Sequence, residues 1–246
     1  MPNLGGRKVH YLLHEDLARL PFAYGRDRLF DLLRNNGLLV VKKRRKVLTT
    51  NSNHPFKIYK NLILDLDITH VFAVIVADIT YIDTHEGFLF LALITDLFSR
   101  KIVGFDISDS LEMTGCLRAL TMASQGLPTI LRQPMPVTTP QYTLNLIHHS
   151  DRGVQYCSNR YTQNLKELNF AISMAEAGNC YENAVAERVN GTLKNELGLG
   201  DGLVSKKWAL EMTPKVIDLY NTKRPHWTLN LQKPQDVFQK NIDSLS

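Results

Sequence analysis

Three acidic residues lie on three separate predicted elements of this 246-residue chain. Asp78 follows the apolar run VFAVIVA, and Asp151 follows the apolar segment YTLNLI in the sequence HHSDRG. Glu187 lies in the helical pattern YENAVAERVNGTLKNEL, with 35 residues between it and Asp151. Carboxylates on separate elements can hold two divalent cations against the oxygens of a phosphodiester. The chemistry that these acids indicate is metal-dependent phosphoryl transfer.

Each of the three acids also has a purely structural interpretation. Asp78 could cap the end of a strand, although a carboxylate there is costly to desolvate without a partner. Asp151 lies in a turn sequence, where an Asp side chain bonds the backbone two residues further on. Glu187 could be a solvated helical residue like Glu182 and Glu196, and its spacing from Asp151 is what selects it.

A basic residue shares a helical face with Glu187. Lys194 follows seven residues later, which is about 20° off the same stripe at 3.6 residues per turn. Asn183 and Gly191 lie one turn to either side of the glutamate, and the valines of the segment lie on another face. We therefore expect Lys194 and Asn183 to contact DNA. The alternative for Lys194 is an ordinary surface ion pair.

Positive charge is concentrated near the N-terminus of a chain whose net charge is +5. Residues 1–60 hold 13 Lys and Arg against 4 Asp and Glu, and the remainder is acidic. This distribution favours an anionic polymer as partner, with a solvated basic face as the alternative. Five consecutive cations are expected to contact DNA: Lys42, Lys43, Arg44, Arg45 and Lys46.

Apolar runs and helical patterns predict the elements that position these residues. Three strands joined by short turns are expected at 71–82, 88–98 and 102–108, with Asp96 capping the second turn. Helix, strand, helix, strand and helix follow, which gives a mixed α/β layer fold. Pro214 is expected to kink or split the helix after them. The predicted helices are 112–126, 159–170, 181–197 and 206–224, the last of which contains Pro214, and the predicted strands are 142–149 and 171–175.

The pattern divides the chain into three parts. Two short helices are predicted at 15–22 and 25–37, and together with the basic run they suit a helix-turn-helix module. We therefore expect a helix-turn-helix-like DNA-binding segment at 1–48, a polar linker at 49–70, and a catalytic domain with a C-terminal helix at 71–246.

Several side chains and segments argue against other classes of protein. The apolar runs are far shorter than the roughly twenty residues that span a bilayer, and no secretory signal is seen. Three widely spaced cysteines form neither a disulfide framework nor a metal-binding pair, as expected in a reducing cytoplasm. His148 and His149 could ligate metal or act as a base, but we favour a structural or substrate-positioning role for both.

Five motifs carry a family resemblance: ADITYI, TDLFSRKIVGF, HHSDRGVQY, GNCYENAVAERVNGTLKNEL and YNTKRPHWTL. Together they resemble the transposases of insertion sequences of the IS-three family, within the retroviral-integrase superfamily. The likeness covers essentially the whole chain, since YGRDRLFDLLRNNG resembles the helix-turn-helix segment ahead of that family's core. The chain departs from the family at Ile75, where Trp is usual, and at Glu182, where Asp is usual.

The resemblance implies an α/β RNase H-like core, a five-stranded mixed sheet flanked by helices, that uses Mg²⁺ or Mn²⁺. The family's catalytic, metal-binding acids map onto Asp78, Asp151 and Glu187, and its basic residue maps onto Lys194. The implied activity is that of a DDE transposase, which cleaves a DNA strand and transfers it to target DNA. The implied partners are the insertion-sequence ends, target DNA, other copies of the chain and an upstream-frame product, all in a bacterial cytoplasm.

Two other functions remain open. A plain nuclease on the same fold explains the acids, but it explains neither the basic N-terminal segment nor YNTKRPHWTL. A decayed or repurposed DNA-binding protein is suggested by Ile75 and by the unusual approach LDITHVFAV before Asp78. Cleavage of an end-labelled duplex distinguishes all three functions.

Overall fold

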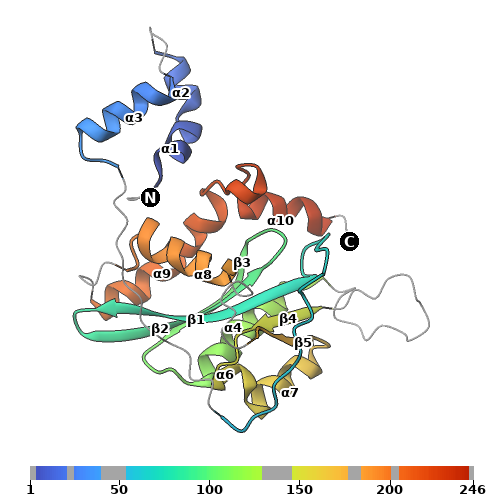
Figure 1. The fold of residues 1–246 in the computed structure, drawn as a ribbon. Coiled ribbons are helices and arrows are strands. Elements are labelled where there is room, and N and C mark those ends of the chain that lie inside the picture. The colour runs from blue at the N-terminus through green and yellow to red at the C-terminus, as the bar shows by residue number, and fades with distance from the viewer. Residues whose placement is uncertain are drawn as a thin grey trace.

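A five-stranded mixed sheet forms the centre of the protein, in a computed structural model that describes residues 4–20, 25–39, 54–128, 146–176, 184–200 and 205–243. Helices cover both faces of this sheet (Figure 1). The strands are β1 (Val74–Thr84), β2 (Gly87–Asp96), β3 (Ile102–Ser108), β4 (Ile147–Ser150) and β5 (Ala171–Met174). They are arranged in the order β3-β2-β1-β4-β5, which confirms the predicted sheet.

The strand β1 is the central element, and its composition follows from burial on both faces. It pairs antiparallel with β2 and parallel with β4, and every residue from Val74 to Ala77 is buried. A strand covered on both sides reads as a continuous apolar run, as this one does. Asp96 caps the turn between β2 and β3, as predicted, because its carboxylate accepts the backbone N–H groups of Phe72 and Ser99, each at 2.7 Å.

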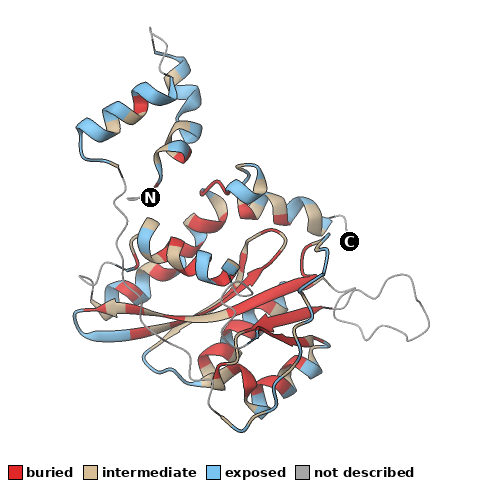
Figure 2. Cartoon of the chain, viewed as in Figure 1, coloured by how far each residue is buried: buried red, intermediate tan, exposed pale blue. Residues whose placement is uncertain are grey.

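Two layers of helices enclose the sheet, and buried residues line both interfaces (Figure 2). One layer packs Leu120 and Tyr161 against Ile75, and the other packs Val189 and Ile217 against Leu91. No helix of the described residues is long and apolar enough to cross a membrane. The first layer contains α4 (Met113–Gln125), α6 (Val154–Cys157) and α7 (Asn159–Glu167). The second contains α8 (Ala184–Gly191), the π-helical turn η2 (Thr192–Glu196) and α9 (Lys206–Thr222), followed by the 3-10 turn η3 (Trp227–Leu229) and α10 (Pro234–Ile242).

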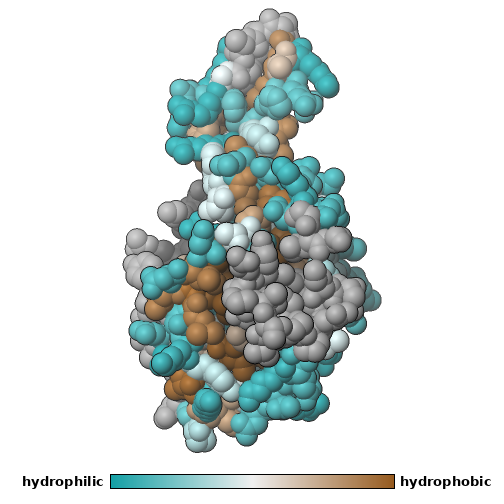
Figure 3. All heavy atoms as spheres, turned by 90° about the vertical axis from the view of Figure 1, so that its right-hand side faces the viewer, coloured by the Kyte–Doolittle hydropathy of each residue, from teal (hydrophilic) through white to brown (hydrophobic). Residues whose placement is uncertain are grey.

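Three N-terminal helices stand apart from the sheet (Figure 1). The predicted pair corresponds to the second and third of them, and the helical stop at Gly37 is confirmed by its φ of +65°. No described residue in 4–39 belongs to the hydrophobic clusters of the core, although apolar atoms continue from these helices onto the core in Figure 3. The helices are α1 (Gly6–Leu12), which was not predicted, α2 (His14–Ala18) and α3 (Arg26–Asn35).

Two expectations about helices are corrected. Pro214 does not split the helix, because α9 contains it and runs from 206 to 222. Because Pro214 is on the exposed side of the helix, water can satisfy the carbonyl group that the missing N–H leaves free. The segment predicted as one helix at 181–197 changes to a π-helical turn at Thr192. A π turn adds one residue to the local repeat and often occurs at functional sites.

Gly104 allows β3 to pack directly on α4. A Cβ atom at this position would lie 2.2 Å from the carbonyl oxygen of Ala119, which belongs to the helix backbone. We expect Gly104→Ala to lower the free energy of unfolding by about 1–3 kcal/mol, because the helix must move. Urea unfolding measures the loss. Gly126→Ala at the end of α4 is the control, since its nearest neighbour would be at 3.5 Å. Equal losses in the two variants would contradict this packing.

Candidate active site

Parallel pairing between β1 and β4 brings two of the predicted acids together. Ala77 pairs with Ser150, so the next residues along the two parallel strands, Asp78 within β1 and Asp151 just after β4, lie side by side. Neighbouring strands are about 4.8 Å apart. The Asp151 carboxylate accepts the backbone N–H of Gly153 at 2.9 Å, which fixes the turn after β4. Asp151 therefore makes the backbone bond predicted for a turn residue and also lies beside Asp78, as predicted for a cluster of acids.

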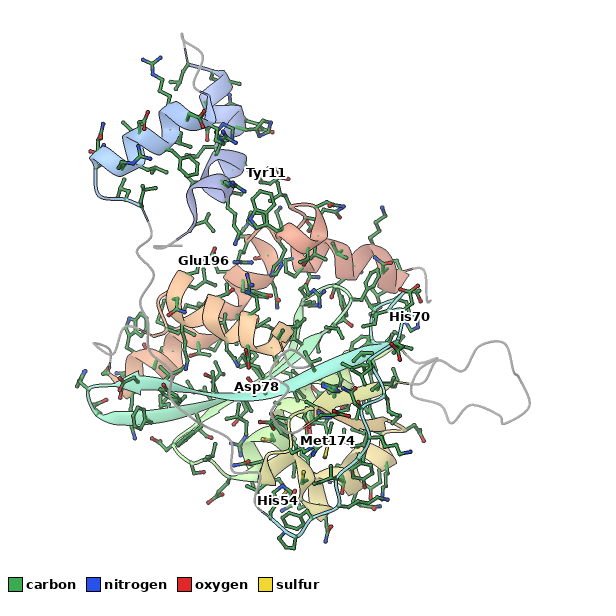
Figure 4. The ribbon with its side chains drawn as sticks, in the orientation of Figure 1. Tyr11, His54, His70, Asp78, Met174 and Glu196 are labelled. Atoms are coloured by element: carbon green, nitrogen blue, oxygen red, sulfur yellow. The ribbon has the colours of Figure 1, made fainter. Side chains whose placement is uncertain are left out.

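The third predicted acid, Glu187, lies in the first turn of α8 and is exposed to solvent. Burial, together with the negative charges of Asp151 and Glu187, raises the pKa of Asp78 to about 8. Figure 4 shows Asp78 near the middle of β1, and a hydrogen bond from Asn190 places it on the side of the sheet that α8 covers. Asp151 and Glu187 are thus both close enough to Asp78 for their charges to affect its pKa.

The three carboxylates are ligands of the kind that a hard divalent cation prefers, although they are not grouped as closely as the ligands of a bound ion. Within the described residues, no three His, Cys, Asp or Glu side chains are grouped closely enough to hold an ion. Asp78, Asp151 and Glu187 offer only carboxylate oxygens, which are the ligands that Mg²⁺ and Mn²⁺ prefer. The pKa of Asp78 is raised mainly by burial and further by the negative charges of Asp151 and Glu187, and a bound cation would oppose this rise. These residues therefore fit such an ion.

Asn190 is a site residue that was missed in the sequence. Its side-chain amide donates a hydrogen bond to Oδ2 of Asp78, and this bond opposes the rise in the pKa of that acid. Asn190 is buried and lies three residues after Glu187, so the two residues are neighbours on α8. Its position in an Asn-Gly pair, which is typical of turns, concealed this role.

Lys194 lies close to the acids, but its amino group rests on an aromatic ring. The Nζ atom is 3.9 Å from the centre of the Tyr81 ring. Burial lowers the pKa of Lys194 to about 8, while the charges of Asp78 and Asp83 act in the opposite direction. The π turn carries Lys194 to this position. The other predicted helical contact, Asn183, lies outside the described residues, as do Lys42, Lys43, Arg44, Arg45 and Lys46.

His148 and His149 make structural contacts, in line with the structural or substrate-positioning role that we favoured for them. Both are fully buried on β4. The Nε2 atom of His148 shares a hydrogen bond of 2.9 Å with the hydroxyl of Tyr161, and Nδ1 of His149 shares one of 2.8 Å with the hydroxyl of Ser173. These bonds hold β4 to α7 and β5, and thereby support Asp151.

Acid is expected to destabilise the fold through buried histidines. Burial lowers the pKa of His148 and that of His226 to about 3, whereas histidines of the unfolded chain titrate near 6.5. Between these values the unfolded chain binds more protons, so each histidine lowers stability by up to about 1.4 kcal/mol per pH unit as the pH falls. Urea unfolding from pH 7 to pH 4 should show a shallower dependence for His148→Gln than for the parent protein. Parallel curves would contradict the assignment.

The motif YNTKRPHWTL braces the end of α9 against the sheet. The side-chain amide of Asn221 bonds both the N–H and the carbonyl of Ile102, each at 3.0 Å. The hydroxyl of Tyr220 donates to the carbonyl of Arg100 and shares a bond with His226, each at 3.1 Å. The motif therefore has a structural function in the core.

The same motif also supports the segment that carries Lys194. Arg224 donates to the Glu196 carboxylate at 2.7 Å, and Lys8 of α1 reaches that carboxylate at 3.1 Å. Glu196 ends the π turn, and its location between the core helices and the N-terminal helices is shown in Figure 4. This buried ion cluster links α1, the π turn and the segment that follows α9. The sequence contained no signal that would pair Lys8 with a residue 188 positions away.

Two integrase core domain families match this chain, one at residues 68–180 and the other at 168–234. A solved structure with a similar fold is the simian T-cell lymphotropic virus intasome in complex with PP2A regulatory subunit B56 gamma. Its TM-score is 0.54 at 15% identity, covering 95% of this chain and 74% of that chain, so the likeness concerns the fold alone. Fold and acids together define an RNase H-like integrase core.

Two curated relatives are similar along most of their length. One is the Insertion element IS600 uncharacterized 31 kDa protein of Shigella sonnei, which is 36% identical over 93% of this chain and 80% of the relative. The other is the Transposase for insertion sequence element IS904 of Lactococcus lactis, which is 32% identical over 95% of this chain and 92% of the relative. The chain belongs to the insertion-sequence transposases of the DDE/integrase superfamily. It is therefore a polynucleotidyl transferase of DNA transposition, a class that acts on DNA, uses divalent metal and assembles into oligomers.

Proposed function

We propose that Asp78, Asp151 and Glu187 are the catalytic, metal-binding acids of this transposase, with Mg²⁺ or Mn²⁺ as the cofactor. The observation that carries the proposal is the register of β1 and β4, which sets Asp78 beside Asp151. The effect of Glu187 on the pKa of Asp78 supports its membership in the same site. The acidic, oxygen-only character of the site agrees with cation binding.

The residues of the site would contribute position and charge. Asn190 orients Asp78, the turn bond to Gly153 holds Asp151, and the exposed side chain of Glu187 is free to turn toward a cation. Bound divalent ions lower the pKa of an attacking oxygen and stabilise the leaving oxygen. Water would attack at the end of the element and release a 3′-OH, which then attacks a target phosphodiester. No covalent intermediate with the enzyme is needed.

The partners of this reaction would be the insertion-sequence ends, target DNA and further copies of the chain. The upstream-frame product would supply additional DNA binding, and the reaction would take place in the bacterial cytoplasm. Lys194 and Asn183 would contact DNA near the cut, and the basic run would contact it elsewhere. The division at 1–48, 49–70 and 71–246 stays a prediction.

Cleavage of an end-labelled duplex that carries one end of the element tests this function. A transposase with Mg²⁺ leaves a defined nick at that end, and it joins the released 3′-OH to a second duplex. Scattered cuts would favour a plain nuclease, and binding without cuts would favour a decayed DNA-binding protein. Either result would overturn the proposed function.

The basic run is expected to contribute to DNA affinity through phosphate contacts. Replacing Lys43 and Arg44 by Gln should weaken binding and reduce the slope of log K against log[salt] by roughly two units, because each contact contributes about 0.9. Fluorescence anisotropy at several salt concentrations measures the slope. Replacing the exposed Lys207 and Lys215 of α9 is the control for a change of two charges. An unchanged slope in the first variant would mean that the run is a solvated face.

A further inference from the structure

Two aromatic rings lie on the hairpin of β1 and β2, in the part of the hairpin beyond Asp78. Tyr81 follows Asp78 by three residues and is half-buried, and Phe88 at the start of β2 is 52% exposed. The two ring centres are 5.3 Å apart at an interplanar angle of 79°, so the edge of one ring meets the face of the other. Beyond Ala77, β1 has no pairing with β4 in the described residues. The part of the hairpin that carries the rings thus projects past the parallel strands.

A cation covers the Tyr81 ring in the DNA-free protein. The Nζ atom of Lys194 is 3.9 Å from its centre, and the charges of Asp78 and Asp83 act on the same amino group. A cation–π contact at a partly exposed site favours this arrangement by only about 2- to 5-fold (~0.5–1 kcal/mol). A DNA phosphate offers Lys194 a full negative charge instead. Lys194 is therefore held in a position that it can leave at small cost.

An unpaired base is the ligand that fits the ring once Lys194 has moved. Base stacking on an aromatic side chain favours binding by about 5- to 140-fold (~1–3 kcal/mol), which exceeds the contact that it replaces. The charged groups of Asp83 and Lys194 lie near the Tyr81 ring. They suit a flat ring with polar edges better than an aliphatic ligand. Because the amino group of Lys194 lies on the Tyr81 ring and is also acted on by the charge of Asp78, a base stacked on this ring would belong to the strand that is cut.

We propose that Tyr81, with Phe88 against it, is a stacking site for an unpaired nucleobase next to the cut phosphodiester. Lys194 covers the Tyr81 ring until DNA binds and then moves to a phosphate of the same strand. The inference rests on the proposed function, because it takes the three acids as the place of cleavage. The alternative is that the two rings only stabilise the hairpin.

A combination of protein and DNA changes tests the stacking site. The probe is a labelled duplex with a short unpaired 3′ end of adenosines, in EDTA so that binding is measured without cleavage. Tyr81→Leu should weaken binding by about 5- to 140-fold, whereas Tyr81→Phe, which keeps the ring, should bind within about 2-fold of the parent. Removing the base at one position of the unpaired end should weaken binding to the parent by the same factor. That abasic change should have no further effect on Tyr81→Leu, since ring and base then act as one pair.

The outcomes separate this inference from the proposed function. If the parent protein cleaves DNA in Mg²⁺ but Tyr81→Leu binds the unpaired probe as the parent does, the stacking site is refuted while the function stands. If no abasic position affects binding to the parent, the stacking site is also refuted. Thermal unfolding of Tyr81→Leu checks that the hairpin is intact. Coupling between Tyr81 and a single base position, with Tyr81→Phe unaffected, is the result that we expect.

Discussion

Asp78→Asn is expected to reduce strand cleavage by roughly 10³-fold or more, which corresponds to about 4 kcal/mol in the barrier. The substitution keeps the shape of the side chain and its contact with Asn190, but it removes the charge that would hold a cation beside Asp151. Asp151→Asn and Glu187→Gln should have effects of the same order. DNA binding should change little, because each substitution removes negative charge from a surface that meets a polyanion.

Single-turnover cleavage and fluorescence anisotropy on the same duplex measure the two properties. Glu211→Gln is the matched control, since Glu211 is also an exposed helical glutamate but lies on α9, away from the acids. It should cleave like the parent protein. If Glu187→Gln cleaved as well as Glu211→Gln does, Glu187 would not be the third acid. Loss of DNA binding in Asp78→Asn would point instead to a damaged fold.

Glu196→Gln is expected to lower the free energy of unfolding by about 3–5 kcal/mol. The Glu196 carboxylate faces both Lys8 and Arg224, whose side chains are only 10% and 5% exposed. Removing the single negative charge leaves two buried cations without compensation, and this costs more than the ion pairs themselves contribute. For a chain of this size the midpoint of thermal unfolding should fall by roughly 6–20 °C.

A double variant tests the cause of that loss. Adding Arg224→Met to Glu196→Gln removes one of the uncompensated cations, so the double variant should be more stable than Glu196→Gln alone. Calorimetry or urea unfolding gives the comparison. If the two losses simply add, the damage comes from lost packing and not from buried charge. A surface pair such as Arg34 and Asp31 serves as the control, since breaking it should cost less than about 1 kcal/mol.

The sequence was sufficient for the elements whose patterns are local. The apolar run before Asp78 predicted a strand buried on both faces, and the strand before Asp151 came from the same kind of pattern. Asp96 was predicted as a turn cap because the turn TDLFSRK is short and polar. The parallel register of β1 and β4 then brought Asp78 and Asp151 together, as the resemblance implied.

Features that depend on long-range contacts were missed. The bond from Asn190 to Asp78 joins residues 112 positions apart, and nothing in an Asn-Gly pair indicates it. The prediction that Glu187 and Lys194 share one helical face was based on a regular α-helix. The π turn after Gly191 changes which side chains face the acids. Tyr81 read as an ordinary strand residue, because β propensity and stacking favour the same side chain. The role of each of these residues depends on its contacts in the folded protein, which a local sequence pattern does not contain.

Each outer strand of the sheet has backbone groups at one residue that are bonded by another part of the chain. On β3, the Asn221 amide takes the place of a neighbouring strand at Ile102. On β5, the extended segment after Phe56 runs alongside, with Leu62 N–H bonded to the Ser173 hydroxyl and Met174 N–H near the Lys60 carbonyl at 3.4 Å. Exposed strand edges invite pairing between molecules, and that leads to aggregation. At Ile102 and Met174 these bonds leave the backbone groups unavailable for pairing with the sheet of another copy.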